Sequence, residues 1–114
     1  MTISLSTHVL DLNSGVPAEG VKIEFWKIDE TNMYLVTKFI TNQDGRITPQ
    51  IIEQAGEYQL LFYIGDYFKS KTIHLSKPMF LNKVPIQFGI EISNRNYHIP
   101  LLISPWGYQT YRGS

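Results

Sequence analysis

The stretch from residue 3 to residue 10 alternates in side-chain character with the two-residue period of a β-strand. One set of alternating positions consists of Ile3, Leu5, Thr7 and Val9. Because successive side chains of a strand point to opposite faces, this pattern predicts a strand with one face in a core. The strand is expected to stop before the turn-forming sequence NSG at 13–15.

The same pattern recurs along the rest of the chain. Segments rich in β-branched and aromatic residues are separated by turn signals such as Asp44-Gly45. Further strands are expected at 21–28, 33–41, 56–63, 84–92, 97–103 and 108–112, and a short helix at 64–71. Seven short strands without a long helical pattern predict an all-β fold, an antiparallel β-sandwich of about seven to eight strands with one short helix.

Size and charge limit the function classes. The chain has 114 residues, 43% of them hydrophobic and 18% charged, which is enough apolar material for the core of a single domain over residues 1–114. Ten basic and ten acidic residues cancel. A neutral chain argues against nucleic acid or an anionic membrane surface as the partner, because both favour a basic excess. The same neutrality favours self-association.

The N-terminal sequence bears on the compartment. Its first residues, MTISLSTHVLDLN, contain neither a basic leader nor a long apolar run. We therefore expect no signal peptide, no membrane span and a cytoplasmic location. A periplasmic protein would look the same once its leader had been removed. The chain has no cysteine, which excludes disulfides and thiol chemistry.

Three histidines are candidates for acid–base chemistry. His8 and His98 lie inside expected strands, whereas His74 lies in an irregular, lysine-rich region and is expected to be exposed. Each strand histidine could be a half-buried ring with only a structural hydrogen bond. Alternatively, both project into one concave site, where an imidazole can move a proton near neutral pH. Arg46 is either a solvated loop charge or a planar two-donor fork for an anionic or carbonyl-rich ligand.

The C-terminal segment, residues 97–114, is aromatic and has no polar tail. Because chain ends usually fray, this composition predicts a folded segment that is used in a site. The sequence shows no phosphate-binding glycine loop, no serine nucleophile elbow and no cysteine metal set. Two histidines and a carboxylate could hold zinc, but no spacing demands it, so we expect neither a metal nor another cofactor.

Four motifs in chain order carry a resemblance to a known family. They are LSTHVLD at 5–11, DGR at 44–46, YHIPLL at 97–102 and YRGS at 111–114. Together they resemble the signatures of the 5-hydroxyisourate hydrolases, the transthyretin-like enzymes of urate breakdown. The resemblance covers the whole chain. The histidine pair and the YRGS ending distinguish these hydrolases from transthyretin itself.

The resemblance implies a transthyretin-like sandwich assembled as a homotetramer, a dimer of dimers, with active sites in a channel between the dimers. It also implies hydrolysis of 5-hydroxyisourate to 2-oxo-4-hydroxy-4-carboxy-5-ureidoimidazoline, in which water attacks a ring carbonyl and a C–N bond opens without a cofactor. The implied catalytic residues are His8, Arg46 and His98. The implied substrate-binding residues are Tyr111, Arg112, Gly113 and Ser114.

Two other classes of protein share this kind of fold. A non-catalytic carrier of small apolar ligands would use an apolar channel, in which His8, His98 and Arg46 would be costly to bury. An immunoglobulin-like adhesion domain would more often carry an export signal and would not bring its C-terminus into a shared site. A strictly monomeric protein would count against both the hydrolase and the carrier.

Overall fold

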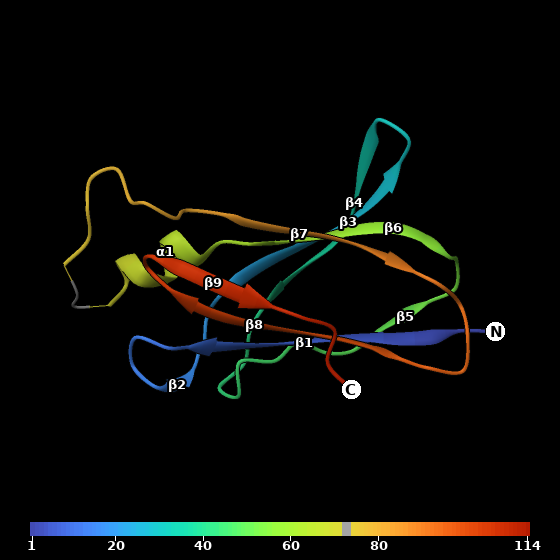
Figure 1. The fold of residues 1–114 in the computed structure, drawn as a ribbon, viewed down its shortest axis with the longest axis horizontal. Coiled ribbons are helices and arrows are strands. Elements are labelled where there is room, and N and C mark those ends of the chain that lie inside the picture. The colour runs from blue at the N-terminus through green and yellow to red at the C-terminus, as the bar shows by residue number, and fades with distance from the viewer. Residues whose placement is uncertain (72–73) are drawn as a thin grey trace.

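The computed structural model describes residues 1–71 and 74–114 and contains two β-sheets and one short helix (Figure 1). The strands are β1 (Ile3–Asp11), β2 (Val16–Pro17), β3 (Lys22–Asp29), β4 (Asn32–Ile40), β5 (Gln50–Ile52), β6 (Gly56–Phe62), β7 (Val84–Ile90), β8 (Tyr97–Ser104) and β9 (Gly107–Thr110). The helix is α1 (Ile64–Lys69). No helix within the described residues is long and apolar enough to cross a membrane.

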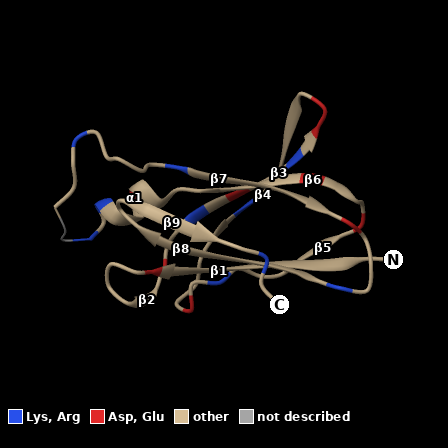
Figure 2. Ribbon diagram, in the orientation of Figure 1, with Lys and Arg blue, Asp and Glu red and all other residues tan. Residues whose placement is uncertain are grey.

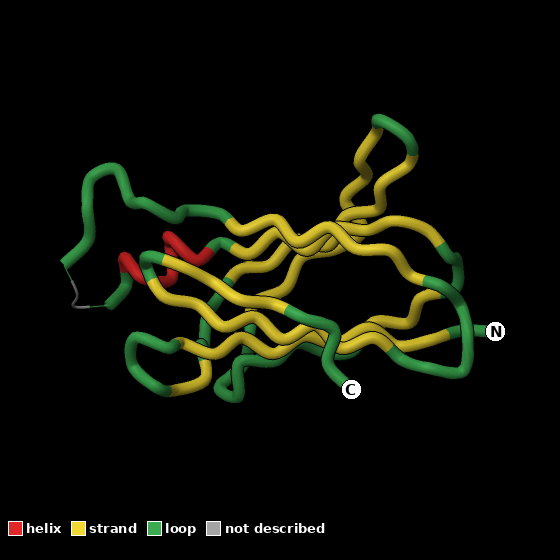
Figure 3. Tube along the Cα trace, in the orientation of Figure 1, coloured by secondary structure: helices red, strands yellow, loops and turns green. Residues whose placement is uncertain are grey.

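The two sheets stack as the layers of a sandwich, with loops at both ends (Figure 3). One sheet has the order β2-β1-β8-β9, with β5 paired to β1, and the other has the order β4-β3-β6-β7. All strand pairs are antiparallel except β1 with β8, which run parallel. The predicted all-β sandwich with one helix is confirmed, and the parallel pair is its one departure from an antiparallel arrangement.

Each expected strand is present, with its ends within two residues of the expected positions. Two strands were not expected, β2 and β5, because two or three residues are too few to show an alternating pattern. The last strand ends at Thr110 rather than at 112. Beyond it the chain leaves β9 and crosses to β8, where Gly113 forms an isolated bridge with His98.

The core explains which side chains of the first sheet point outward. Alternate residues of β1 are buried, beginning with Ile3 and Leu5, and β8 buries Ile99, Leu101 and Ile103 in the same way. The residues between them lie on the opposite face and are half-buried, except for Pro100, which is buried. The alternation therefore places both strand histidines on the outer face of the same sheet.

This sheet carries little charge. Figure 2 shows its strands almost entirely without charged residues, and Asp11 at the end of β1 is the exception. The charges near its outer face therefore come from loops and from the C-terminal segment. Arg46 precedes β5, and Arg112 follows β9.

Asp11 joins the helix to the first strand. Its carboxylate is buried and accepts hydrogen bonds from the backbone N–H groups of Asn13 and Ser14 at 2.8 and 3.1 Å and from the hydroxyl of Tyr67 at 2.7 Å. Burial, and next the hydrogen bond to Asp11, raise the pKa of Tyr67, so its hydroxyl remains a donor. The contact fixes α1 against the sheet.

We expect Tyr67→Phe to lower the free energy of unfolding by about 1–3 kcal/mol, because a buried carboxylate oxygen loses its donor. Urea unfolding followed by circular dichroism measures the change. Tyr34→Phe, at a tyrosine that is 53% exposed, is the matched control and should leave the midpoint unchanged. Equal midpoints for the two variants would contradict a stabilising role for the Asp11 contact.

Candidate functional site

The parallel register of β1 and β8 places the candidate histidines on neighbouring strands. Ser6 pairs with His98, and His8 pairs with Pro100, two positions further along both strands. On the inner face, the buried hydroxyl of Thr7 donates to the carbonyl of Ile99 at 2.6 Å. The side chains on the outer face therefore lie on two strands that are also joined by this hydrogen bond on the inner face.

A tight loop brings Arg46 to the same face. The side-chain oxygen of Asn42 accepts hydrogen bonds from the N–H groups of Asp44 and Arg46 at 2.9 and 3.0 Å. Gly45 has a φ of 72°, and its carbonyl accepts the N–H of Val9 at 2.8 Å. A Cβ at Gly45 would collide with the Val9 carbonyl oxygen, so the loop can approach β1 this closely only with glycine.

Arg46 lies beside His8. The two residues form an isolated bridge, and Nη2 of Arg46 lies 3.4 Å from Nδ1 of His8. A guanidinium can only donate, so Nδ1 of His8 is the acceptor in this contact. Burial, and next the charge of Arg46, lower the pKa of His8, which favours a neutral ring at pH 7.

His98 is held by different partners. Its Nδ1 lies 2.7 Å from the hydroxyl oxygen of Ser6, and its carbonyl accepts the N–H of Gly113 at 2.7 Å. Burial lowers the pKa of His98, and the charges of Arg46 and His8 lower it further. Both rings are thus biased toward the neutral form, which can accept a proton.

A polar cavity of about 440 Å³ opens between these groups. The residues that line it are Ser4, Ser6, Arg46, Asn96, Tyr97, His98 and Ser114. A guanidinium, an imidazole and several hydroxyl groups therefore line the same cavity and can contact one ligand. His8 adjoins this cavity through its contact with Arg46.

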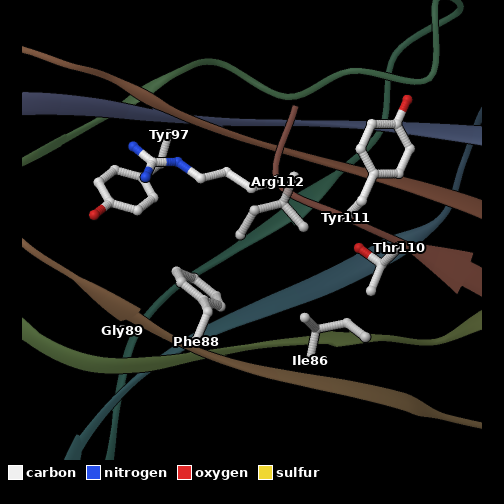
Figure 4. Close-up of a pocket in the computed structure, with 8 residues that line it drawn as sticks. Ile86, Phe88, Gly89, Tyr97, Thr110, Tyr111 and Arg112 are labelled. Carbon is white, nitrogen blue, oxygen red and sulfur yellow. The ribbon is translucent and has the colours of Figure 1, made fainter. Parts of the chain in front are cut away.

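The expected substrate-binding residues of the C-terminal segment divide between two places. Ser114 lines the polar cavity, and Gly113 packs against His98. Arg112 and Tyr111 instead line a second cavity of about 330 Å³, where apolar side chains such as Phe88 dominate. Figure 4 shows the Arg112 side chain extended toward Tyr97 while Tyr111 points away from it. The guanidinium carbon of Arg112 lies 3.8 Å from the centre of the Tyr97 ring.

Tyr97 lines both cavities, which makes them neighbours. His74 is exposed, as the sequence predicts, and lies in the loop between α1 and β7. The structure thus brings His8, Arg46, His98 and Ser114 together. It places Tyr111 and Arg112 at the neighbouring cavity, which shares Tyr97 with the polar cavity.

Four residues of the polar cavity were not identified as site residues from the sequence: Ser4, Ser6, Asn96 and Tyr97. Ser6 stands two positions before His8, so the alternation of β1 already placed it on the same face. Asn96, whose side-chain oxygen accepts the N–H of Ser4 at 2.9 Å, immediately precedes β8 and carries no pattern that marks it. Within residues 1–71 and 74–114, no group of three or more His, Asp or Glu side chains is arranged to hold a metal ion.

The chain is similar to known proteins over nearly its whole length. The family model described as HIUase/Transthyretin family matches residues 5–113. The chain is 46% identical to "5-hydroxyisourate hydrolase 2" of Rhizobium meliloti (strain 1021), over 96% of this chain and 95% of that protein.

Two solved structures resemble this protein closely. The crystal structure of (S)-allantoin synthase has a TM-score of 0.92 and 39% identity; the match covers 99% of this chain but only 44% of that one. The Klebsiella pneumoniae 5-hydroxyisourate hydrolase has a TM-score of 0.80 and 34% identity, over 97% of this chain and 99% of that one. Since the family model and these relatives match nearly the whole chain, the protein belongs to the HIUase/Transthyretin family.

Proposed function

We propose that the protein is a hydrolase that converts 5-hydroxyisourate to 2-oxo-4-hydroxy-4-carboxy-5-ureidoimidazoline. The observation that carries this proposal is the polar cavity on the outer face of β1 and β8, where His98 and Arg46 meet beside His8. Relatives at more than 40% identity carry the name 5-hydroxyisourate hydrolase. A flat, carbonyl-rich ring suits a site with a guanidinium donor and a neutral imidazole.

His98 is the proposed general base. Its imidazole takes a proton from water as the water oxygen bonds to a ring carbonyl carbon of the substrate. The resulting tetrahedral intermediate collapses, the C–N bond breaks, and the imidazolium returns the proton to the departing ring nitrogen. Positioned acid–base catalysis of this kind contributes roughly a hundred- to ten-thousandfold.

Arg46 is the proposed electrophilic group. Its guanidinium donates to the substrate carbonyl and stabilises the negative charge that develops on oxygen as water adds. His8 accepts from Arg46 and holds the guanidinium toward the cavity. Ser114 lies at the cavity and is the proposed hydrogen-bonding partner of the substrate, with Gly113 shaping the wall beside it.

We further propose that the chain is one domain that assembles as a homotetramer, a dimer of dimers, with sites in a channel between dimers. Exposed aromatic side chains near the site face support an assembly. Trp106, Tyr108 and Tyr111 are each 46–57% exposed. In such an assembly Tyr111 and Arg112 would complete the substrate-binding wall. Sedimentation velocity at micromolar concentration tests this, and a strict monomer would contradict it.

The carrier alternative is weakened by the polarity of the cavity. The guanidinium of Arg46 and the imidazole of His98 would lose hydration if an apolar ligand covered them, and apolar contacts would not compensate for that loss. The proposed location is the cytoplasm, which fractionation of the source cells would test. No cofactor is proposed.

The pH dependence of the reaction follows from the shifted histidines. Burial, followed by the neighbouring charges of Arg46 and His8, lowers the pKa of His98, so its ring is neutral and able to act as a base at pH 7. We expect kcat/KM to hold steady from pH 8 to pH 7 and to fall on acidification, with a midpoint below the usual histidine value of about 6.5. The assay requires subtraction of spontaneous decay at each pH. A midpoint above 6.5, or no acid limb, would contradict a neutral imidazole base.

The direct test is the decay of freshly generated 5-hydroxyisourate, followed by ultraviolet absorbance. We expect the protein to accelerate decay, and to do so equally after dialysis against a chelator. Decay at the spontaneous rate in the presence of folded protein would refute the hydrolase. Loss of activity on chelation, with recovery on adding a metal ion, would refute the cofactor-free reaction.

A further inference from the structure

Ser6 makes the one side-chain hydrogen bond to the ring of His98 among the described residues. Its hydroxyl oxygen lies 2.7 Å from Nδ1, and both groups are partly buried. The two residues are partners in the parallel register of β1 and β8, although they are 92 positions apart in the chain. The contact thus joins two strands of the sheet rather than a strand and a loop.

The contact determines which ring nitrogen can react. With Nδ1 taken by Ser6, Nε2 is the nitrogen left for water or substrate. A neutral imidazole has one N–H and one lone pair, and the hydrogen bond at one nitrogen fixes which nitrogen carries the proton. A base that acts through Nε2 must therefore carry its proton on Nδ1, next to the serine oxygen.

We propose that Ser6 is a positioning residue of the hydrolase, whose Oγ accepts the Nδ1–H of His98 and keeps the Nε2 lone pair available for the proton of water. This inference rests on the proposed function. It goes beyond that function by naming the group that orients the base and the tautomer that the base adopts.

The partners of His8 give that ring the opposite arrangement. Arg46 can only donate, so Nδ1 of His8 is an acceptor and the proton of the neutral ring is on Nε2. In the proposed arrangement Nδ1 is therefore an acceptor in His8 and a donor in His98. His98 acts as the base, and His8 is the acceptor that orients Arg46.

The backbone of the C-terminal segment restrains the His98 ring at its other edge. A Cβ built on Gly113 would lie 2.7 Å from Cδ2 of His98, so the Gly113 backbone already lies close to the ring. The ring is therefore held between the Ser6 hydroxyl at Nδ1 and Gly113 at Cδ2. A site on paired strands with such lateral support keeps a reactive group in place better than a loop does.

Kinetics of serine variants test the proposal. Loss of a partner that orients a reacting group commonly costs roughly ten- to a hundredfold in activity, and we expect Ser6→Ala to lower kcat by such a factor with little change in KM. Ser6→Thr keeps the hydroxyl and should restore most of kcat. Ser70→Ala is the matched control and should keep the wild-type kcat, because it also removes a serine hydroxyl that makes a hydrogen bond, to the carbonyl of Tyr67 at 2.6 Å, but at the end of α1 and outside the lining of the cavity. A Ser6→Ala enzyme with wild-type kcat would overturn the proposal.

Nitrogen-15 NMR of the histidine rings tests the same contact without substrate. In the wild-type protein at pH 7.5 or above, we expect His98 to be mainly the Nδ1–H tautomer, and in Ser6→Ala we expect the Nε2–H form to increase. A wild-type ring that is mainly Nε2–H would overturn the proposal. So would a tautomer ratio unchanged in Ser6→Ala. If Ser6→Ala does not fold, the tautomer of His98 in the wild-type spectrum and the kcat of Ser6→Thr still test the proposal.

The two measurements separate this inference from the proposed function. A wild-type protein that does not accelerate 5-hydroxyisourate decay refutes the hydrolase, whatever the tautomer of His98. An active wild type in which Ser6→Ala changes neither kcat nor the ring tautomer refutes the role of Ser6 alone.

Discussion

Replacing His98 by alanine is expected to lower the turnover of 5-hydroxyisourate roughly a hundred- to ten-thousandfold, the range that positioned acid–base catalysis supplies. The physical reason is the loss of the only imidazole that lines the polar cavity within the described residues. Arg46 remains in the variant, so substrate binding should be affected less than turnover. Stopped-flow absorbance with the spontaneous rate subtracted would give kcat and KM separately.

The matched control is His74→Ala, at an exposed histidine in the loop between α1 and β7. This variant removes one imidazole from the same chain without touching the cavity, and its kinetics should equal those of the wild type. Circular dichroism must show that both variants are folded. A folded His98→Ala protein with undiminished turnover would exclude His98 as the base.

Gly113→Ala is expected to reduce turnover about a hundredfold, the scale reported for displacement of a reacting group by about 1 Å. The added methyl group would lie 2.7 Å from Cδ2 of His98 and 3.2 Å from Cγ of Pro100. Either the ring or the C-terminal segment must move. Movement of the segment would also weaken the hydrogen bond from Gly113 to the His98 carbonyl and shift Ser114.

Gly107→Ala supplies the control for this change. A Cβ at Gly107 meets nothing within 4 Å, and the residue begins β9 only six positions before Gly113. Its turnover should stay close to that of the wild type, and the thermal midpoints of the two variants show how much of any effect is stability. Equal turnover in both variants would mean that the approach of Gly113 to His98 has no catalytic consequence.

The strands of this fold were predictable because their signal is local. Alternation in β1 and the β-branched and aromatic composition of β3 and β6 lie within a few residues of sequence, and turn residues mark the ends. The parallel pairing of β1 with β8 was not predictable in this way. It depends on which strands meet after the chain has crossed between the sheets, and no neighbouring residue encodes that choice.

The candidate site likewise has parts that the sequence predicts locally and parts that depend on contacts between distant strands. His8, Arg46 and His98 were identified from motifs, and the alternation of the strands placed both histidines on one face. The contact between Ser6 and His98 required the register between two distant strands, because a shift of one residue would turn one side chain to the other face. The position of Arg112 over Tyr97 also depends on the point where the chain leaves β9, which the sequence placed two residues too late.

The parallel pairing of β1 and β8 has a consequence for the order of folding. Ser6 and His98 come from strands near opposite ends of the chain, so their contact requires closure of one of the longest loops that the chain can form. Contacts between neighbouring strands, such as the β3–β4 hairpin, need far less loop closure and can form earlier. A nascent or refolding chain would therefore acquire much of its sheet structure before it acquires the serine–histidine contact. In a refolding experiment, recovered hydrolysis should report the final docking of β8 onto β1, after circular dichroism has already registered most of the strands.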